Sequence, residues 1–329
     1  MPPDPVSVPA EPTPALLARP LWCSLQATRP AFLSVTGVAV VLGWAVAWHG
    51  NPADPSLAGG TGGVGVMPLL ATVTLMFALV AHGAANVLND YYDARSGCDA
   101  ANRERLFPFT GGSRFIQNGV FSEQRMARLG YGLLLAVVPA GLWLAVRTGP
   151  QLLPLGLAGL ILAWAYSAPP LRLASRGLGE LAVSAGWTLV VAGSAQVQGW
   201  TMEPGGLLAA VSYGAMVANL LFINQFPDAT ADGQSGKRTL VVRWGRRRAV
   251  AGYAVLVLLA MGLLLAGILI GRLPLAAAWA ALALIPASRA FRDLVRHADS
   301  PSALRPAIIA TIVAAHLHGM LLAVSLAIF

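Results

Sequence analysis

Long apolar runs separated by short polar segments dominate the chain. Nine of them fall near residues 31–49, 64–89, 126–146, 150–168, 178–199, 205–226, 249–271, 273–288 and 304–328. Several reach the roughly 20 residues that an α-helix needs to cross a bilayer. The pattern therefore predicts an all-α, polytopic membrane protein, built as a bundle of nine transmembrane helices.

Composition supports a membrane protein. Of the 329 residues, 56% are hydrophobic and only 11% are charged, whereas about a quarter of a soluble protein is charged. The first 20 residues are rich in proline, carry acids and lack the apolar core of a signal peptide. We expect residues 1–25 to form a disordered cytosolic tail and residues 26–329 to form the transmembrane domain. Cys23 and Cys98 are far apart, so they predict no disulfide framework.

Basic residues fall almost entirely on one side of the predicted bundle. Of the 22 lysines and arginines, all but Arg147 and Arg272 precede the first span or follow an even-numbered span. Cytoplasmic loops carry the excess of Lys and Arg, so we expect a bacterial-type inner or plasma membrane protein with its N-terminus in the cytoplasm. Basic residues in these positions report topology, and we expect no nucleic-acid partner.

The second predicted span ends in the polar stretch NVLNDYYDARSGCD, residues 86–99. Asn86, Asp90 and Asp93 are spaced i, i+4 and i+7, so they share one face of a helix. Gly97 is expected to end that helix and to leave Asp99 on the following loop. Acids at a helix C-terminus oppose its dipole, so a simple solvated helix end would favour Lys or Arg there instead. The acids therefore indicate a functional site.

The sixth predicted span ends in a second copy of this pattern. Asn224, Asp228 and Asp232 are spaced i, i+4 and i+8 and also share one helical face. Pro227 predicts a kinked or unwound helix end at Asp228. Four spans separate one copy from the next, which fits two pseudo-repeated four-helix halves followed by a ninth helix. Both motifs are then expected at the cytoplasmic face.

The oxygen ligands of the two motifs suit Mg²⁺, which proteins hold through one or two carboxylates together with water and phosphate oxygens. The five histidines are scattered and show no zinc-ligand spacing. A glycine-containing basic segment follows each motif, at 103–119 and 233–245. Glycine allows the backbone to approach an anion, and Arg or Lys binds phosphate oxygens. We therefore expect a lipid diphosphate, bound by Arg114, Lys237 and Arg238.

The two motifs, together with YSAPPLRLASRGLGEL at 166–181, resemble those of the UbiA superfamily of intramembrane prenyltransferases. The resemblance extends over the chain from about residue 25. It is greatest to the branch acting on 1,4-dihydroxy-2-naphthoate, on the spacing of Asp90, Asp93 and Asp99 and on the segments GGSRFIQNG and GKRTL. The first span also opens in a similar way, in ATRPAFLSVTG, which contains Arg29.

One departure concerns the segment after the fourth span. Members acting on 4-hydroxybenzoate carry a tyrosine there with a lysine four positions later. In this chain Tyr166 is followed at that distance by Pro170, and the first cation is Arg172. Tyr166 and Arg172 are therefore the corresponding candidates for contact with the diphosphate.

The resemblance implies transfer of a polyprenyl group from polyprenyl diphosphate to an aromatic acceptor in lipid-quinone biosynthesis. The acceptor expected first is 1,4-dihydroxy-2-naphthoate of the menaquinone pathway, and 4-hydroxybenzoate and homogentisate are alternatives. Two Mg²⁺ ions are expected, one on each pair of catalytic carboxylates. The expected metal ligands are Asn86, Asp90, Asp93, Asn224, Asp228 and Asp232.

An ion-coupled secondary transporter is the alternative from another functional class, because paired repeats and buried acids also occur there. The acids of transporters lie near the middle of the membrane, whereas these lie at the predicted cytoplasmic helix ends beside basic loops. This position favours the prenyltransferase.

Overall fold

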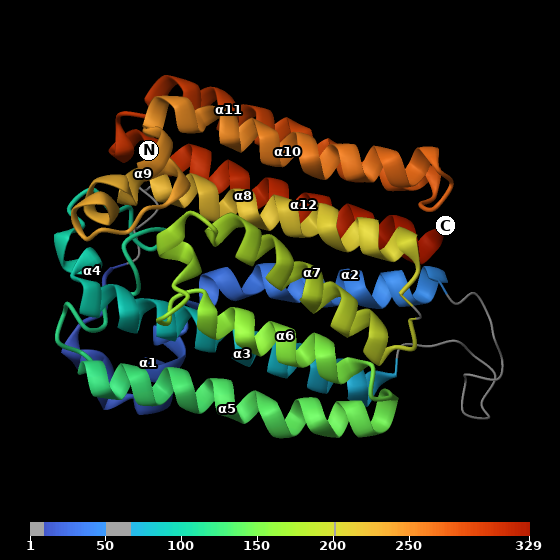
Figure 1. Ribbon diagram of the computed structural model, residues 1–329, viewed down its shortest axis with the longest axis horizontal. Coiled ribbons are helices and arrows are strands. Elements are labelled where there is room, and N and C mark those ends of the chain that lie inside the picture. Colours follow the sequence, from blue (N-terminus) through green and yellow to red (C-terminus); the bar gives the residue numbers. More distant parts are fainter. Residues whose placement is uncertain (1–9, 51–66, 201) are drawn as a thin grey trace, which may run out of the picture.

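The computed structural model describes residues 10–50, 67–200 and 202–329. Within these ranges the chain forms an elongated, all-helical bundle whose connections gather at its two ends (Figure 1). The long helices are α2 (Pro30–Gly50), α3 (Pro68–Ser96), α5 (Glu123–Thr148), α6 (Leu152–Ala165), α7 (Gly179–Val197), α8 (Pro204–Gln234), α10 (Arg246–Leu269), α11 (Leu284–His297) and α12 (Arg305–Ile328). The short segments are η1 (Pro14–Ala18), α1 (Pro20–Ala27), α4 (Cys98–Ala101), η2 (Leu173–Arg176), α9 (Leu240–Trp244), η3 (Leu275–Ala283) and η4 (Pro301–Leu304).

Each of the nine predicted spans coincides with a helical segment, although 64–66 lie outside the described residues. Six helical stretches of the described chain are long and apolar enough to cross a membrane: α2, α3, α5, α8, α10 and Pro301–Ile328. Helix α6 is apolar but shorter, and α7 and the η3–α11 pair are not among the six. The multi-pass, all-α architecture is thus confirmed, while the count of nine crossings stays a prediction.

The eighth predicted span has different boundaries from those expected. It begins as the 3₁₀ segment η3 and continues as α11 to His297, well beyond the predicted end at 288. In α11, Ala287, Ala290 and Leu294 are buried against the bundle, while basic residues lie between them in the sequence. A helix that is apolar on one face only does not extend an apolar run, so its second half was missed.

Part of the expected N-terminal tail is helical. Residues 1–9 lie outside the described residues, but η1 and α1 follow them. Cys23 of α1 is buried in a cluster that includes Phe115 and Met126. Before η1, the Glu11 carboxylate pairs with the Arg105 guanidinium at 2.8 Å. The disorder expected over 1–25 is therefore not seen from residue 10 onward, and the division of the chain at residue 25 stays a prediction.

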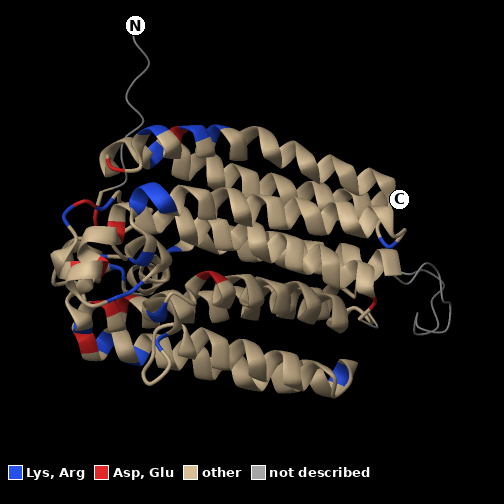
Figure 2. Ribbon diagram, turned by 45° about the horizontal axis from the view of Figure 1, so that its top comes forward, with Lys and Arg blue, Asp and Glu red and all other residues tan. Residues whose placement is uncertain are grey.

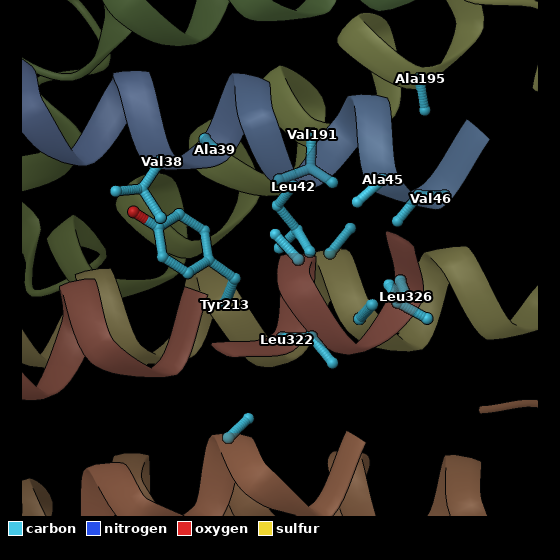
Figure 3. Packing of buried hydrophobic residues seen from close by; sticks show 14 of the residues in the cluster. Val38, Ala39, Leu42, Ala45, Val46, Val191, Ala195, Tyr213, Leu322 and Leu326 are labelled. Atoms are coloured by element: carbon cyan, nitrogen blue, oxygen red, sulfur yellow. The ribbon is translucent and has the colours of Figure 1, made fainter. Parts of the chain in front are cut away.

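Helix α8 lies at the centre of the bundle, and small residues bring its neighbours close. A Cβ added at Gly214 of α8 would lie 2.4 Å from the Ser184 carbonyl oxygen of α7. Such close backbone approach is how small residues stabilise helix pairs in membranes. The adjoining Tyr213 packs among apolar side chains of α2, α7 and α12 (Figure 3) and donates a hydrogen bond to the Val35 carbonyl at 2.7 Å.

Charged residues gather at one end of the bundle (Figure 2). The C-terminal ends of α3 and α8 lie at this end, together with α4 and α9 (Figure 1). The Cys98 thiol of α4 donates to a carboxylate oxygen of Asp232 at 3.0 Å, which joins α4, the segment that follows α3, to the end of α8. The two acidic motifs therefore lie on the same side of the bundle, as the sequence predicts.

We expect Gly214→Ala to destabilise the fold by about 1–3 kcal/mol, because the added methyl group would collide with the backbone of α7. Gly262→Ala in α10 is the matched control, since no atom lies within 4 Å of a Cβ there. The apparent unfolding temperature of both variants in detergent provides the measurement. A Gly214→Ala protein as stable as the control would show that the close approach of α7 and α8 at Gly214 does not contribute to the stability of the fold.

Candidate active site

A cavity of about 410 Å³ runs along the bundle between α2, α3, α5, α6, α7 and α8. One end is polar, and the side chains of both acidic motifs contribute to its wall. Further along, the wall is apolar and contains residues such as Leu144, Leu152 and Val197. The polar part is lined by Asn86, Asn89, Asp93, Cys98, Asp99, Asn102, Asn224, Asp228, Asp232 and Lys237.

The first motif places its two carboxylates differently. Helix α3 continues through the motif and ends at Gly97, whose φ of +78° is the left-handed conformation expected there. Asp90 is buried and accepts a hydrogen bond from the Ser113 backbone N–H at 3.1 Å. Asp93 instead lines the cavity, and the Asn89 amide donates to it at 3.1 Å. Asp90 is therefore held by the loop after α4, whereas Asp93 faces the cavity.

Asp99 lies in the short helix α4, not on the loop expected from the sequence. It is buried against Gly112, where an added Cβ would lie 2.7 Å from its Oδ2 and 3.0 Å from Oδ1 of Asp90. Burial, followed by the charges of Asp93 and Asp90, raises the pKa of the Asp99 carboxyl well above its ordinary value. The close group of acids thus favours a bound proton or cation.

The second motif lies on one continuous helix. Pro227 does not unwind α8, which runs on to Gln234, so the expected unwinding is wrong. Membrane helices tolerate proline where the surrounding structure supports the backbone, and Pro227 is buried here. Asp228 accepts a hydrogen bond from the Asn102 amide at 2.6 Å, and Asn224 and Asp232 line the same cavity. The predicted shared face of these three residues is confirmed.

Lys237 joins the two motifs. Its ammonium lies 2.9 Å from Oδ2 of Asp93 and 3.6 Å from Oδ1 of Asp232. Burial opposes the charged form, but the carboxylates of Asp232 and Asp93 outweigh it and raise the pKa of Lys237 well above its ordinary value. A cation is thus already favoured at the position where the two motifs face each other.

Of the other side chains singled out from the sequence as candidates near the diphosphate, only some line the cavity. Arg29 and Tyr166 line the cavity, but Arg114, Arg172 and Arg238 do not. The Arg114 guanidinium donates to the Asp99 carbonyl. Arg172 is exposed in the turn before η2, and exposed Arg238 is held at its backbone by η2. A diphosphate contact by these three residues stays a prediction that this arrangement does not favour.

The donor set fits Mg²⁺ as a cofactor. Oδ1 of Asp90 and Oδ1 of Asn224 are buried without a partner within the described ranges. A buried polar atom without a hydrogen-bond partner destabilises the fold unless a bound ligand supplies the missing interaction. No group of three His, Cys, Asp or Glu side chains in the described chain could hold a metal by itself. Mg²⁺ does not need one, because water and substrate phosphate complete its octahedron.

Several residues of the site were not assigned a role from the sequence. Asn102 binds Asp228 across 126 residues of chain, and Cys98 binds Asp232 across 134. No short-range sequence pattern indicates a role for either residue, because both contacts form only when α4 packs beside α8. The contact of Asn89 with Asp93 could have been predicted from the sequence, since Asn89 lies one turn before Asp93 on the same helix.

Gly112→Ala should disrupt the site without unfolding the protein, because its Cβ would displace the Asp99 and Asp90 carboxylates. Gly119→Ala is the matched control in the same loop: its φ of +70° is close to the +72° of Gly112, but no atom lies within 4 Å of a Cβ. Both variants carry a similar backbone strain of about 1 kcal/mol. We expect stabilisation against heat by Mg²⁺ and pyrophosphate to be lost only in Gly112→Ala. Equal stabilisation of both variants would contradict this role of Gly112.

Comparisons with known proteins agree with this architecture. The UbiA prenyltransferase family matches residues 38–312. A 1,4-dihydroxy-2-naphthoate octaprenyltransferase of Escherichia coli (strain K12) is 30% identical over 308 residues, covering 90% of this chain and 92% of that protein. The same enzyme of Mycobacterium leprae (strain TN) is 32% identical over 227 residues, covering 68% and 72%.

Among solved structures, a UbiA homolog from Archaeoglobus fulgidus bound to DMAPP and Mg²⁺ has the same fold. Its TM-score is 0.57 at 14% identity, and the match covers 92% of this chain and 99% of that one. The family match spans most of the sequence, and the fold agrees with it over nearly the whole length. This chain therefore belongs to the UbiA prenyltransferase family.

Proposed function

We propose that this protein transfers a polyprenyl group from polyprenyl diphosphate to 1,4-dihydroxy-2-naphthoate, a step of menaquinone biosynthesis. The observation that carries the proposal is the meeting of two acidic motifs at the polar end of a long cavity whose far part is apolar. The names of the similar enzymes from E. coli and M. leprae support the choice of acceptor. The diphosphate then belongs at the acids, and the prenyl tail belongs in the apolar part.

The carboxylates would hold two Mg²⁺ ions, one on Asp90 and Asp93 and one on Asp228 and Asp232. Bound there, Mg²⁺ stabilises the negative charge that develops on a departing diphosphate. The C–O bond of the donor breaks with its electron pair on the diphosphate. An electron-rich ring carbon of the acceptor then forms the new C–C bond. The same carbon loses a proton, or its carboxylate as CO₂, and the electron pair of the broken bond stays on the ring and restores its aromaticity. Lys237 lies where its ammonium would meet the diphosphate oxygens.

The apolar part of the cavity would keep water from the reactive allylic carbon and hold the tail. The cavity as a whole is lined by α3 from Thr74 to Asp93, a rise of about 28 Å for a helix of this length. Gly156 and Gly159 of α6 also line it, and no atom lies within 4 Å of a Cβ at either position. The wall is therefore open at these glycines, which suits a long prenyl chain. Exclusion of water prevents hydrolysis to prenyl alcohol.

The proposed placement in the membrane puts nine spans, in two four-helix halves and a ninth helix, around this cavity. The N-terminus and the acidic motifs would face the cytoplasm. Support comes from the basic residues that gather at the motif end of the bundle (Figure 2). The water-soluble diphosphate would enter from the cytoplasm, while the prenyl tail would stay within the bilayer.

Asp228→Asn should lower Mg²⁺-dependent prenyl transfer at least about 100-fold, because one carboxylate charge on the metal is lost. Asp299→Asn is the control: Asp299 pairs with Arg247 on the surface and should leave the activity unchanged. The assay measures prenylated product from octaprenyl diphosphate, with 1,4-dihydroxy-2-naphthoate, 4-hydroxybenzoate and homogentisate compared as acceptors. Full activity of Asp228→Asn would exclude the two-metal arrangement. A preference for another acceptor would overturn the proposed substrate.

Gly159→Trp should shift the donor preference toward shorter chains, because the indole would fill the apolar part of the cavity. Gly132→Trp in α5 is the control, since Gly132 is exposed and is not part of the cavity wall. We expect the ratio of kcat/KM for octaprenyl over geranyl diphosphate to fall about tenfold, which corresponds to a loss of roughly 1.4 kcal/mol of binding. An unchanged ratio would place the tail elsewhere.

A further inference from the structure

A polar cluster lies in the cavity wall between the acidic motifs and the apolar part. It consists of His82 of α3, Thr36 of α2 and Trp187 of α7, all of which line the cavity. The Nδ1 atom of His82 is 2.8 Å from the Thr36 hydroxyl. The imidazole ring meets the Trp187 ring edge to face, with ring centres 4.9 Å apart at 88°. Three helices thus fix one imidazole inside the membrane bundle.

Two groups of this cluster remain available for a ligand. The Thr36 hydroxyl occupies Nδ1 of His82, and Nε2 has no partner among the residues that the structure describes. The indole N–H of Trp187 is buried and equally lacks a partner in the described ranges. A buried polar group without a partner is unfavourable, so the indole N–H of Trp187 needs an acceptor on a molecule in the cavity, and Nε2 of His82 is free to bond to the same molecule.

The position of the cluster fits an aromatic acceptor. His82 lies one turn before Asn86 on the same face of α3, about 6 Å along the helix axis. On α2, Phe32 lies one turn before Thr36, and both line the cavity. Arg29 lines the cavity too, and its Nε is buried without a partner in the described chain. Aromatic rings, hydrogen-bonding groups and one cation therefore surround the space beside the diphosphate end.

We propose that His82, oriented by Thr36, and Trp187 form the binding site for the hydroxylated ring of the acceptor. A ring hydroxyl both donates and accepts, so it satisfies Nε2 of His82 and the indole N–H of Trp187 together. The carboxylate of the acceptor would face Arg29. The proposal rests on the proposed function and names the residues that recognise the acceptor. His82 is a positioning residue, since it presents the ring to the donor carbon and does not bind the diphosphate.

The test uses the purified full-length enzyme with Mg²⁺ and octaprenyl diphosphate. His82→Phe keeps an aromatic ring but removes the hydrogen bond, and Trp187→Phe removes the indole N–H. We expect each to raise the KM for 1,4-dihydroxy-2-naphthoate about tenfold, as loss of one buried hydrogen bond does, and to leave the KM for the diphosphate within about twofold. Thr72→Val is the matched control: Thr72 of α3 does not line the cavity, and its hydroxyl donates to the Pro68 carbonyl of its own helix.

Competition by 2-naphthoate, which lacks both hydroxyls, separates recognition of the hydroxyl from a general packing effect. The wild-type enzyme should bind the dihydroxy acid more tightly than 2-naphthoate, and His82→Phe should lose most of this difference. Equal increases in both KM values, or an unchanged difference between the two acids, would overturn the proposal.

Equilibrium binding of 1,4-dihydroxy-2-naphthoate, measured with Mg²⁺ and pyrophosphate present, does not depend on turnover. If the wild-type protein binds this acid but transfers no prenyl group, the proposed function fails. The site still stands in that case if His82→Phe weakens binding about tenfold. If the wild-type protein does not bind the acid, or if His82→Phe binds it unchanged, the proposed site is wrong.

Discussion

The structure depends on bringing five carboxylates together at one end of a membrane bundle. Burying charge in a poorly solvated environment is costly unless cations or hydrogen-bond donors compensate it. Lys237 supplies one cation between Asp93 and Asp232, and backbone N–H groups of Gly111 and Ser113 face Asp228 and Asp90. The C-terminal ends of α3 and α8 and the loop after α4 must meet for this compensation to exist.

This requirement organises the cavity into zones of different chemistry. The acidic end suits Mg²⁺ and diphosphate, the middle presents imidazole and indole groups, and the remainder is apolar. A donor that combines an anionic head with a hydrocarbon tail matches the two outer zones. An aromatic acceptor matches the middle zone, where it would lie beside the bond that breaks. Under the proposed function, the order of the zones along one cavity would place both reactants for a single transfer step.

Prediction from sequence succeeded where one short-range pattern decides the structure. Apolar runs located the helices, and the 3.6-residue period placed Asn224, Asp228 and Asp232 on one face. It failed where packing overrides the local signal. Pro227 stays within α8, where it is buried against the rest of the bundle, and α11 buries only one face against the bundle.

The sequence by itself determined the helical class and the two acidic motifs, because each depends on neighbours within a few turns. It also determined the grouping of basic residues at one end, because these residues follow every second span along the chain. Only the tertiary structure decided which partner each acid has. Asn102 reaches Asp228, Cys98 reaches Asp232 and Lys237 reaches Asp93 across more than 120 residues of chain. The same holds for the contact of His82 with Thr36 and Trp187, since three separate helices must pack before that site exists.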